Sequence, residues 1–276
     1  MEGMVSRSEF WGRLLQHLSG IVEGLGEGEC SKPLSLAEAA ADIGVDYGRV
    51  KAPQLISIDV LEDLPRVLRS HGLYVVRLGQ YHTGRASFIL CRARPGYRRE
   101  VLRPEDVSAA PRLPVEPRQP PRWVVELAGH LGAEALASVA AVELVEALAR
   151  GGKVYMLSSL RFGNAVFRFQ PSSCSETYTY RGQVEVDAVL GEGSVYTLEA
   201  KTLSRRRSVF KYKIAFSAQA LAETLGQEVH PLVAFVEKRG GSLAAVAALL
   251  APAAVPGTPY PVEEMRPRVR LAVEIL

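Results

Sequence analysis

The chain has 276 residues, of which 47% are hydrophobic and 23% are charged, and its formal net charge is +3. This length suits one large domain or two smaller ones, and the composition is that of an ordinary globular protein. Because a net charge of +3 excludes a general polycation, any contact with phosphates must come from local basic clusters.

The N-terminal part of the chain predicts a small α+β module over residues 1–110. Ser8 can cap a first helix, and helical periodicity predicts three helices, over residues 9–23, 36–43 and 58–70. Two apolar runs around a glycine-containing turn predict a β-hairpin with strands at 73–78 and 86–91. This order is compatible with a winged helix that selects DNA and equally with a structural cap.

Five prolines lie within residues 110–122, which predicts a stiff, extended connector. We therefore expect the domain boundary at 111–122 and a second domain over residues 123–276. That domain begins with a helix over 123–150, broken near Gly129 or Gly132. A mostly helical stretch is predicted at 208–225, and strands are predicted at 153–158, 165–169, around Asp187, around Glu199, at 230–237 and at 269–275.

The most informative segment of the sequence runs from Arg181 to Thr202. Two apolar, β-branched runs flank a Gly-Glu-Gly turn, with Asp187 in the first run and Glu199 and Lys201 in the second. Side chains at positions i and i+2 of a strand share a face, so Glu199 and Lys201 project together and a hairpin can bring Asp187 beside them. Two carboxylates and an ammonium on one face can hold Mg²⁺ and activate water against a phosphodiester. The alternative is a solvated strand edge with a weak ion pair, although residues 195–198 look buried.

This D…E-x-K pattern resembles the core of the PD-(D/E)xK nuclease superfamily, with Val186 standing where the name pattern has proline. The resemblance implies a restriction-endonuclease-like αβββ-α-β core with a mixed central sheet. It also implies that Asp187 and Glu199 bind a divalent metal, Mg²⁺ or in its place Mn²⁺, and that Lys201 orients the attacking water. The matching positions lie at Glu134, 161–163, 182–187 and 198–201. The chain departs from the group after the E-x-K strand, where Phe210–Phe216 lacks the usual glutamine.

Further candidate residues surround this motif. Glu134 is the candidate for a helix carboxylate that joins the metal site, and Glu185 is a second acid on the strand of Asp187. Gln219 is expected to orient Lys201 or to contact a phosphate. The candidates for gripping the DNA backbone are basic: Arg161, Arg205, Arg206, Arg207, Lys211 and Lys213. For each of these residues the alternative is an ordinary solvated surface.

The cysteines and the N-terminal residues bear on the cellular compartment of the protein. Cys30, Cys91 and Cys174 are widely spaced, which predicts neither a zinc site nor a disulfide framework and suits a reducing compartment. The first residues lack the apolar core of a signal peptide, and residues 242–255 are too short and proline-interrupted to cross a membrane. We therefore expect a soluble, cytoplasmic protein with no membrane partner.

These expectations describe a metal-dependent DNA endonuclease of the type II restriction class, which would act as a homodimer if both strands are cut. A DNA repair or Holliday-junction-resolving nuclease, an RNA-directed nuclease, and a non-catalytic DNA-binding protein with the nuclease fold are the alternatives. The chain lacks a Walker A motif and a G-x-G-x-x-G in a strand-to-helix setting, so we expect no nucleotide cofactor.

Overall fold

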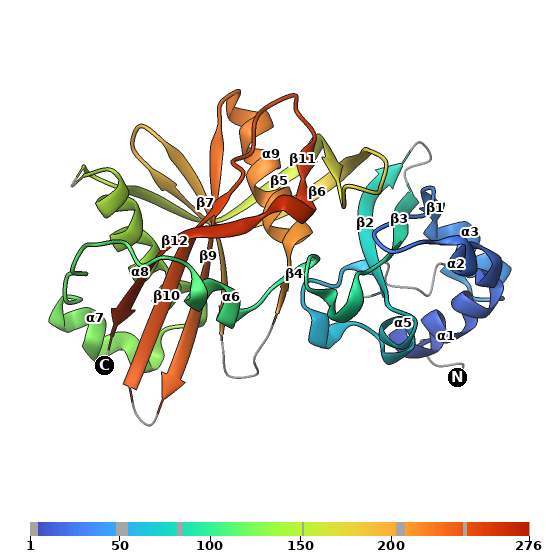
Figure 1. Ribbon diagram of the computed structural model, residues 1–276, viewed down its shortest axis with the longest axis horizontal. Helices are drawn as coiled ribbons and strands as arrows, with labels where there is room; N and C mark the ends of the chain where they lie inside the picture. Colours follow the sequence, from blue (N-terminus) through green and yellow to red (C-terminus); the bar gives the residue numbers. More distant parts are fainter. Residues whose placement is uncertain are drawn as a thin grey trace.

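The computed structural model describes residues 5–47, 55–81, 85–150, 152–202, 208–239 and 242–275. The protein is mixed α/β, with one ten-stranded sheet that takes strands from both halves of the chain (Figure 1). In chain order its strands are β1 (Leu34–Ser35), β2 (Leu73–Tyr81), β3 (Arg85–Arg92), β5 (Tyr155–Gln170), β6 (Tyr178–Gly191), β7 (Val195–Thr202), β9 (Val229–Arg239), β10 (Ser242–Ala251), β11 (Tyr260–Pro261) and β12 (Arg266–Glu274). Across the sheet they follow the order β1-β3-β2-β6-β7-β9-β10-β12; β5 pairs with β6, and β11 pairs with β5.

Short helices surround the hairpin of β2 and β3 at the N-terminal end of the molecule (Figure 1). The hairpin is confirmed, with Tyr74 of β2 opposite Cys91 of β3 in an antiparallel pair. The first predicted helix is in fact two helices, and its cap is Ser6 and not Ser8, because the Ser6 hydroxyl accepts from the backbone N–H of Glu9. The helices here are α1 (Arg7–His17), α2 (Ser19–Gly24), α3 (Leu36–Asp42) and α5 (Arg66–Ser70).

The helix predicted over residues 58–70 is wrong in its first half. Val60 forms an antiparallel bridge with Val209, and the carbonyl of Asp59 accepts from the N–H of Phe210 at 2.9 Å. This pairing holds the segment extended, and only a 3-10 turn η2 (Leu61–Asp63) and α5 remain helical. Tertiary pairing therefore overrides the local helical pattern.

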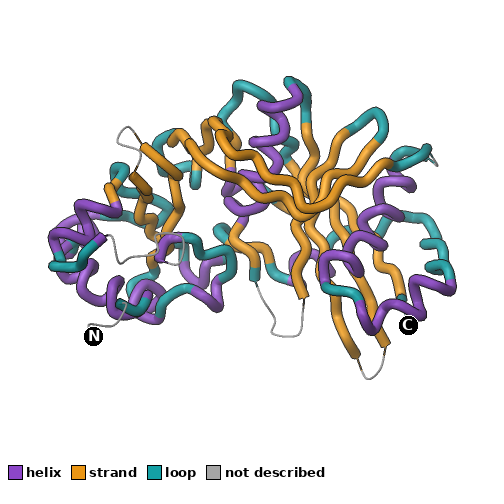
Figure 2. Tube along the Cα trace, turned by 180° about the vertical axis from the view of Figure 1, so that it is seen from behind, coloured by secondary structure: helices purple, strands orange, loops and turns teal. Residues whose placement is uncertain are grey.

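Two longer helices cover opposite faces of the central strands (Figures 1 and 2). Leu198 and Ala200 of β7 pack in one apolar cluster with α8 (Ala133–Leu148), whereas Val233 and Phe235 of β9 pack in another with α9 (Lys211–Leu225). Because side chains alternate along a strand, Glu199 projects from the face opposite α8. The strands in the middle are covered on both sides, which explains their nearly continuous apolar sequences.

The helix expected over 123–150 breaks as predicted, into α7 (Arg122–Leu127), a 3-10 turn η4 (Ala128–His130) and α8. The two strands expected at 153–158 and 165–169 are one long strand, β5, with a register shift between Phe162 and Ala165. Strand β10 was missed, because its sequence SLAAVAALLA is apolar nearly throughout and shows no alternation of apolar and polar residues. No helix within the described ranges is long and apolar enough to cross a membrane.

The two halves of the chain meet through several backbone contacts. Strand β4 (Val101–Leu102) pairs with β8 (Val209–Phe210), directly before α9. Gly79 of β2 pairs with Arg181 of β6 so closely that a Cβ on Gly79 would lie 1.8 Å from the Arg181 carbonyl oxygen. The proline-rich segment runs beside β12, since the N–H of Arg270 donates to the carbonyl of Pro111 at 2.9 Å. The two-domain division at 111–122 stays a prediction.

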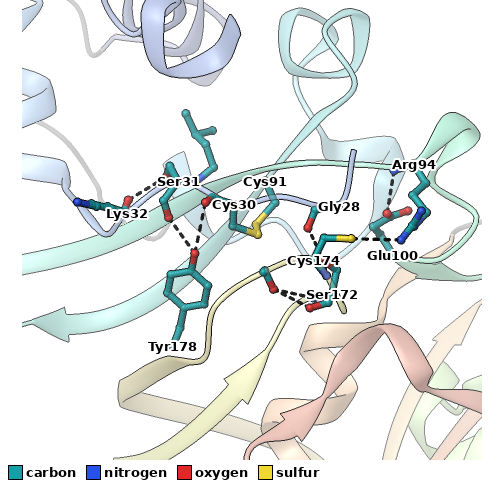
Figure 3. The surroundings of a disulfide bond; sticks show 12 residues. Gly28, Cys30, Ser31, Lys32, Cys91, Arg94, Glu100, Ser172, Cys174 and Tyr178 are labelled. Atoms are coloured by element: carbon teal, nitrogen blue, oxygen red, sulfur yellow. Dashed lines mark hydrogen bonds between the residues drawn. A yellow bond between two sulfur atoms is a disulfide. The ribbon is translucent and has the colours of Figure 1, made fainter. Parts of the chain in front are cut away.

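A disulfide joins Cys30 to Cys91, which corrects the expectation that the cysteines are unpaired (Figure 3). The two residues form an isolated antiparallel bridge with a Cα–Cα distance of 4.0 Å, although 61 positions separate them in sequence. Cys174 is free and exposed. The cysteines therefore no longer argue for a reducing compartment.

Candidate active site

Glu199 and Lys201 project from the same face of β7, as their spacing predicts. Glu199 is buried, with 1% of its surface exposed, and the Nζ of Lys201 lies 2.7 Å from its Oε1. Neither oxygen of Glu199 has a hydrogen-bond partner of normal geometry in the described part of the chain, so the contact with Lys201 is an ion pair. A buried carboxylate with spare acceptor capacity in the middle of a sheet is costly.

Asp187 lies where the pairing of β6 with β7 ends. The last paired residues are Ala188 and Leu198, and beyond them the Oδ2 of Asp187 accepts from the backbone N–H of Ala200 at 2.8 Å. The Asp187 carboxylate thus accepts from an N–H of β7 that lies beyond the last β6–β7 backbone pair. This bond fixes its carboxylate next to the strand that carries Glu199.

A second lysine reaches the site from helix α9. The Nζ of Lys213 lies 3.9 Å from the Oε2 of Glu199 and 3.4 Å from the carbonyl oxygen of Glu185. Lys213 was predicted to grip the DNA backbone from a basic surface block, whereas the structure brings it beside the buried carboxylate.

Both lysines carry their charge at neutral pH. Burial by itself disfavours the ammonium form of Lys201, but attraction to Glu199 and then to Asp187 and Asp59 outweighs it and raises the pKa of Lys201. The same balance, with Glu199, Asp59 and Asp187 as the attracting charges, raises the pKa of Lys213. Neither amine is therefore a neutral base, and both act as positive charges beside Glu199.

Asp59 is a functional candidate that the sequence analysis missed. It lies in the extended segment before η2, half-buried, and its charge acts on both Lys201 and Lys213. The signal for it was the short alternation Ile58-Asp59-Val60, in which the two apolar neighbours are buried and the acid faces the other way. That alternation was hidden by the helical periodicity of the longer window.

The metal predicted for this site is tested by the donor groups present. Among the residues whose placement is described, no group of three or more His, Cys, Asp or Glu side chains is arranged to hold a metal ion. Asp187 and Glu199 are a pair of carboxylates, and the two buried oxygens of Glu199 without hydrogen bonds fit a hard cation that prefers oxygen ligands. The residues thus fit a site that completes its coordination from substrate and water.

Glu185 and Arg161 are engaged with each other. They face each other across β5 and β6, with the Arg161 Nε 3.2 Å from the Glu185 Oε1 and both side chains more than half exposed. The prediction that Glu185 binds metal with Asp187 stays a prediction, since an exposed ion pair of this kind is weak. Arg161 keeps an exposed position from which it can meet a phosphate.

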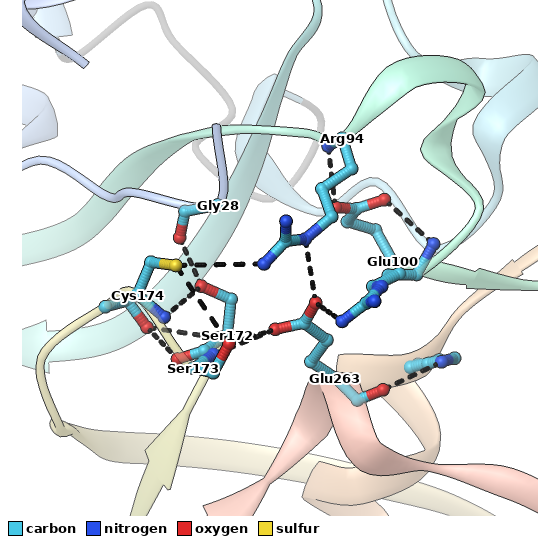
Figure 4. A network of polar contacts seen from close by, with 10 residues as sticks. Gly28, Arg94, Glu100, Ser172, Ser173, Cys174 and Glu263 are labelled. Atoms are coloured by element: carbon cyan, nitrogen blue, oxygen red, sulfur yellow. Dashed lines mark hydrogen bonds and ion pairs between the residues drawn. The ribbon is translucent and has the colours of Figure 1, made fainter. Parts of the chain in front are cut away.

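Lys211 is not a surface residue, and its predicted contact with DNA is wrong. Its side chain is buried, and its Nζ donates to the carbonyl of Glu263 at 3.1 Å. Burial lowers the pKa of Lys211 to about 8. It adjoins a polar network in which the Glu263 carboxylate receives Arg94 at 2.9 Å and Arg99 at 3.0 Å (Figure 4).

Gln219 is fully buried, which excludes the predicted contact with a phosphate. Its amide nitrogen donates to the Glu223 carboxylate and to the carbonyls of Val255 and Thr258, so it anchors the 255–258 loop. Glu134 is the second residue of α8, but its side chain lies outside the described part of the structure. Arg205, Arg206 and Arg207 also lie outside the described residues.

The site therefore comprises Asp187, Glu199 and Lys201 from one hairpin, joined by Lys213 from α9 and by the charge of Asp59. Such a cluster can bind a cation and offset negative charge that develops on a bound anion. Comparison with known proteins found no matching family model, curated protein or solved structure.

Proposed function

We propose that this protein is a metal-dependent endonuclease that hydrolyses phosphodiester bonds in DNA. The observation that carries the proposal is the buried Glu199, whose oxygens lack hydrogen bonds while Lys201 lies at 2.7 Å and Asp187 on the neighbouring strand. A buried ion pair adds little stability compared with apolar packing, so its place in the sheet argues for chemistry. This favours an enzyme over a DNA-binding protein that has lost activity.

The topology supports a restriction-endonuclease-like core. Apart from the two-residue β8, the order α8-β5-β6-β7-α9-β9 repeats the αβββ-α-β order. Strand β6 pairs antiparallel with both β5 and β7, and β9 runs parallel to β7. In this arrangement the acid of β6 and the E-x-K of β7 lie on the face that α9 covers.

In the proposed reaction Asp187 and Glu199 hold the divalent metal, Mg²⁺ or Mn²⁺, which when bound supplies Lewis-acid polarisation of the phosphoryl oxygen. Lys201 orients the nucleophile, and its ammonium offsets the negative charge that grows on the phosphate. Lys213 adds a second positive charge on the other side of Glu199. Arg161 and the arginines at 205–207 are proposed contacts to the DNA backbone, and cutting both strands requires two copies of the site, hence a homodimer.

Cleavage of supercoiled plasmid with Mg²⁺ or Mn²⁺ tests the proposal. We expect the parent to nick or cut, and Lys201→Ala to be slower by about a hundredfold or more, as for the loss of one group that stabilises transition-state charge. Lys153→Ala is the matched control, because Lys153 is exposed and distant in sequence from the motif. Equal rates for the parent and Lys201→Ala would refute the site.

Metal binding gives a second readout that does not depend on activity. Titration of the protein with Mn²⁺, followed by calorimetry or electron paramagnetic resonance, is expected to show binding that Glu199→Gln and Asp187→Asn weaken and Lys153→Ala does not. Thermal unfolding of each variant separates loss of the site from loss of the fold. Undiminished Mn²⁺ affinity in both carboxylate variants would contradict their role as ligands.

A further inference from the structure

Two cavities meet at Arg77 beside the candidate active site. The first, of about 340 Å³, is lined by Asp59 and Lys213 of that site. The second, of about 540 Å³, lies at the junction where β2 pairs with β6. Because Arg77, Tyr180 and Gln183 line both cavities, the two form one continuous groove that leads away from the candidate site.

One face of strand β6 runs along this groove. Positions 181, 183, 185 and 187 are each more exposed than their neighbours in the strand. Alternate residues of a strand share a face, so Arg181 and Gln183 lie on the face that carries Asp187. At about 3.4 Å per residue, Arg181 is about 20 Å along the strand from Asp187. That length corresponds to about six nucleotide steps of B-DNA.

The positive charge of the groove increases away from the candidate site. The first cavity has two acids, Asp59 and Glu185, of which Glu185 lies 3.2 Å from the Nε of Arg161. The second cavity is lined by Arg77 and Arg181, and none of its lining residues in the described part of the chain is Asp or Glu. A groove wall with cations and no acid favours an anion.

Arg77 keeps both its charge and free donors for such an anion. Its Nη2 donates to the Tyr180 hydroxyl at 2.7 Å and to the Gln183 carbonyl at 2.8 Å, and its Nη1 to the Ser57 hydroxyl at 3.3 Å. These bonds use three of the five N–H donors of a guanidinium, and within the described ranges no carboxylate forms an ion pair with Arg77. Neutral acceptors therefore hold the side chain in place without neutralising it.

The far end of the groove is open and polar. Arg181 is exposed, and its side chain forms no hydrogen bond or ion pair with any residue that the structure describes. The amide of Asn164 adds further N–H donors to this cavity. An added Cβ on Gly163 would meet no atom within 4 Å, so the backbone of β5 leaves space for a ligand here.

We propose that the sugar–phosphate backbone of one DNA strand lies in this groove, with Arg77 and Arg181 each contacting a phosphate outside the position that is cut. The inference rests on the proposed function and adds how its substrate is held. Arg77 belongs to β2 and Arg181 to β6, so both halves of the chain bind the same strand. Phosphate contacts position a strand but carry no sequence information, so binding in this groove is independent of sequence.

The salt dependence of DNA binding tests the inference. Fluorescence anisotropy of a labelled duplex, in EDTA to prevent metal-dependent cleavage, gives the affinity at several KCl concentrations. Each phosphate contact contributes about 0.9 to the slope of log affinity against log salt concentration. We therefore expect Arg77→Gln and Arg181→Gln each to lower that slope by about one, and the double variant by about two, equally on two duplexes of unrelated sequence.

Two matched controls separate a phosphate contact from the general loss of an arginine. Arg92 of β3 is half-buried and donates to three backbone carbonyls, as Arg77 donates to neutral groups, but it lines neither cavity. Arg268 matches Arg181, because it is exposed on β12 at the far edge of the sheet. Arg92→Gln and Arg268→Gln should leave the slope unchanged. Arg77→Lys keeps the charge and should restore most of the slope.

The exposed position of Arg181 guards against a folding defect, which thermal unfolding of each variant checks directly. An unchanged slope in either Arg77→Gln or Arg181→Gln, or an equal loss in its control, would overturn the inference. So would a loss confined to one of the two DNA sequences. Metal-dependent plasmid cleavage by the parent with unchanged slopes would leave the nuclease proposal standing, whereas lowered slopes without any cleavage by the parent would sink the nuclease proposal and keep the groove.

Discussion

Two lysines at the start of α9 have the same side chain but different surroundings. Lys211 and Lys213 are two residues apart, which on a helix places them on opposite sides. Lys213 faces Glu199, and attraction to carboxylates keeps it charged. Lys211 faces the interior near Glu263, where burial lowers its pKa. Lys213 therefore belongs to the candidate site, whereas a charged Lys211 destabilises the folded protein.

Lys211 should make stability depend on pH. Its pKa is about 8 in the folded protein and near 10.5 when unfolded, so between these values the unfolded chain binds more protons and stability rises with pH. Below about pH 8 the buried charge of Lys211 lowers the free energy of unfolding by up to about 3 kcal/mol. We expect Lys211→Met to raise the free energy of unfolding at pH 7, and its advantage over the parent to shrink towards pH 10.5.

Urea unfolding of the parent and Lys211→Met at several pH values measures this difference. Subtracting the two curves cancels the titration of groups common to both proteins. Lys153→Met is the control, because Lys153 is exposed and should show no such pH-dependent gain. If the two proteins differ in free energy of unfolding by the same amount across pH 7–10.5, Lys211 is not buried as a cation.

Sequence distance decides which residues of the candidate site could be predicted. Asp187, Glu199 and Lys201 could be predicted, because a strand places i and i+2 on one face and a hairpin joins neighbouring strands. Lys213 could be predicted as a basic residue but not as a neighbour of Glu199. Asp59 could not be found at all, since only the pairing of residues 59–61 with 208–210 brings it there.

The N-terminal half of the chain fixes the start of α9. The N–H of Lys211 donates to the Glu100 carbonyl at 2.9 Å, and the N–H of Ser208 donates to the Glu62 carboxylate at 3.1 Å. These bonds secure the segment that leads into the helix of Lys213. Periodicity in the sequence predicts α8, α9 and the hairpins, but not the extended segment before η2, whose conformation depends on the distant residues 208–210. It also fails for β10, which pairs with the neighbouring β9 but has no alternation of apolar and polar residues.

The Cys30–Cys91 disulfide is a covalent link between distant segments, because it joins the segment before α3 to β3. Closing a loop of 61 residues should stabilise the fold by about 4 kcal/mol through the lost freedom of the unfolded chain. We therefore expect Cys30→Ser to lower the free energy of unfolding by up to that amount, measured by urea titration without reductant. Cys174→Ser should have little effect, since Cys174 is exposed and free. Identical stabilities of the parent and Cys30→Ser would contradict the pairing.

One apolar core spans the expected domain boundary. A single cluster of buried side chains includes Trp11 of α1, Phe88 of β3, Phe167 of β5 and Phe216 of α9. The backbone of β2 approaches β6 at Gly79, where no larger residue fits. A boundary inferred from proline content alone could not anticipate this shared core, because proline restricts only the local chain.

We therefore expect the protein to unfold in one cooperative transition, since neither half can expose its part of the shared core without cost. Far-UV circular dichroism and tryptophan fluorescence should give coincident urea curves. Of the two tryptophans, the buried Trp11 should dominate the fluorescence change and report on the N-terminal half, because Trp123 is already exposed in the folded protein. Gly79→Val should destabilise both halves together, because its side chain would force β2 away from β6. The matched control is Gly12→Val in α1, where an added Cβ meets no atom within 4 Å and helix propensity predicts no loss of stability, since valine is no worse than glycine in a helix. Two separate transitions in the parent, or a Gly79→Val variant that loses only the N-terminal half, would show instead that the C-terminal half and the candidate site stand alone.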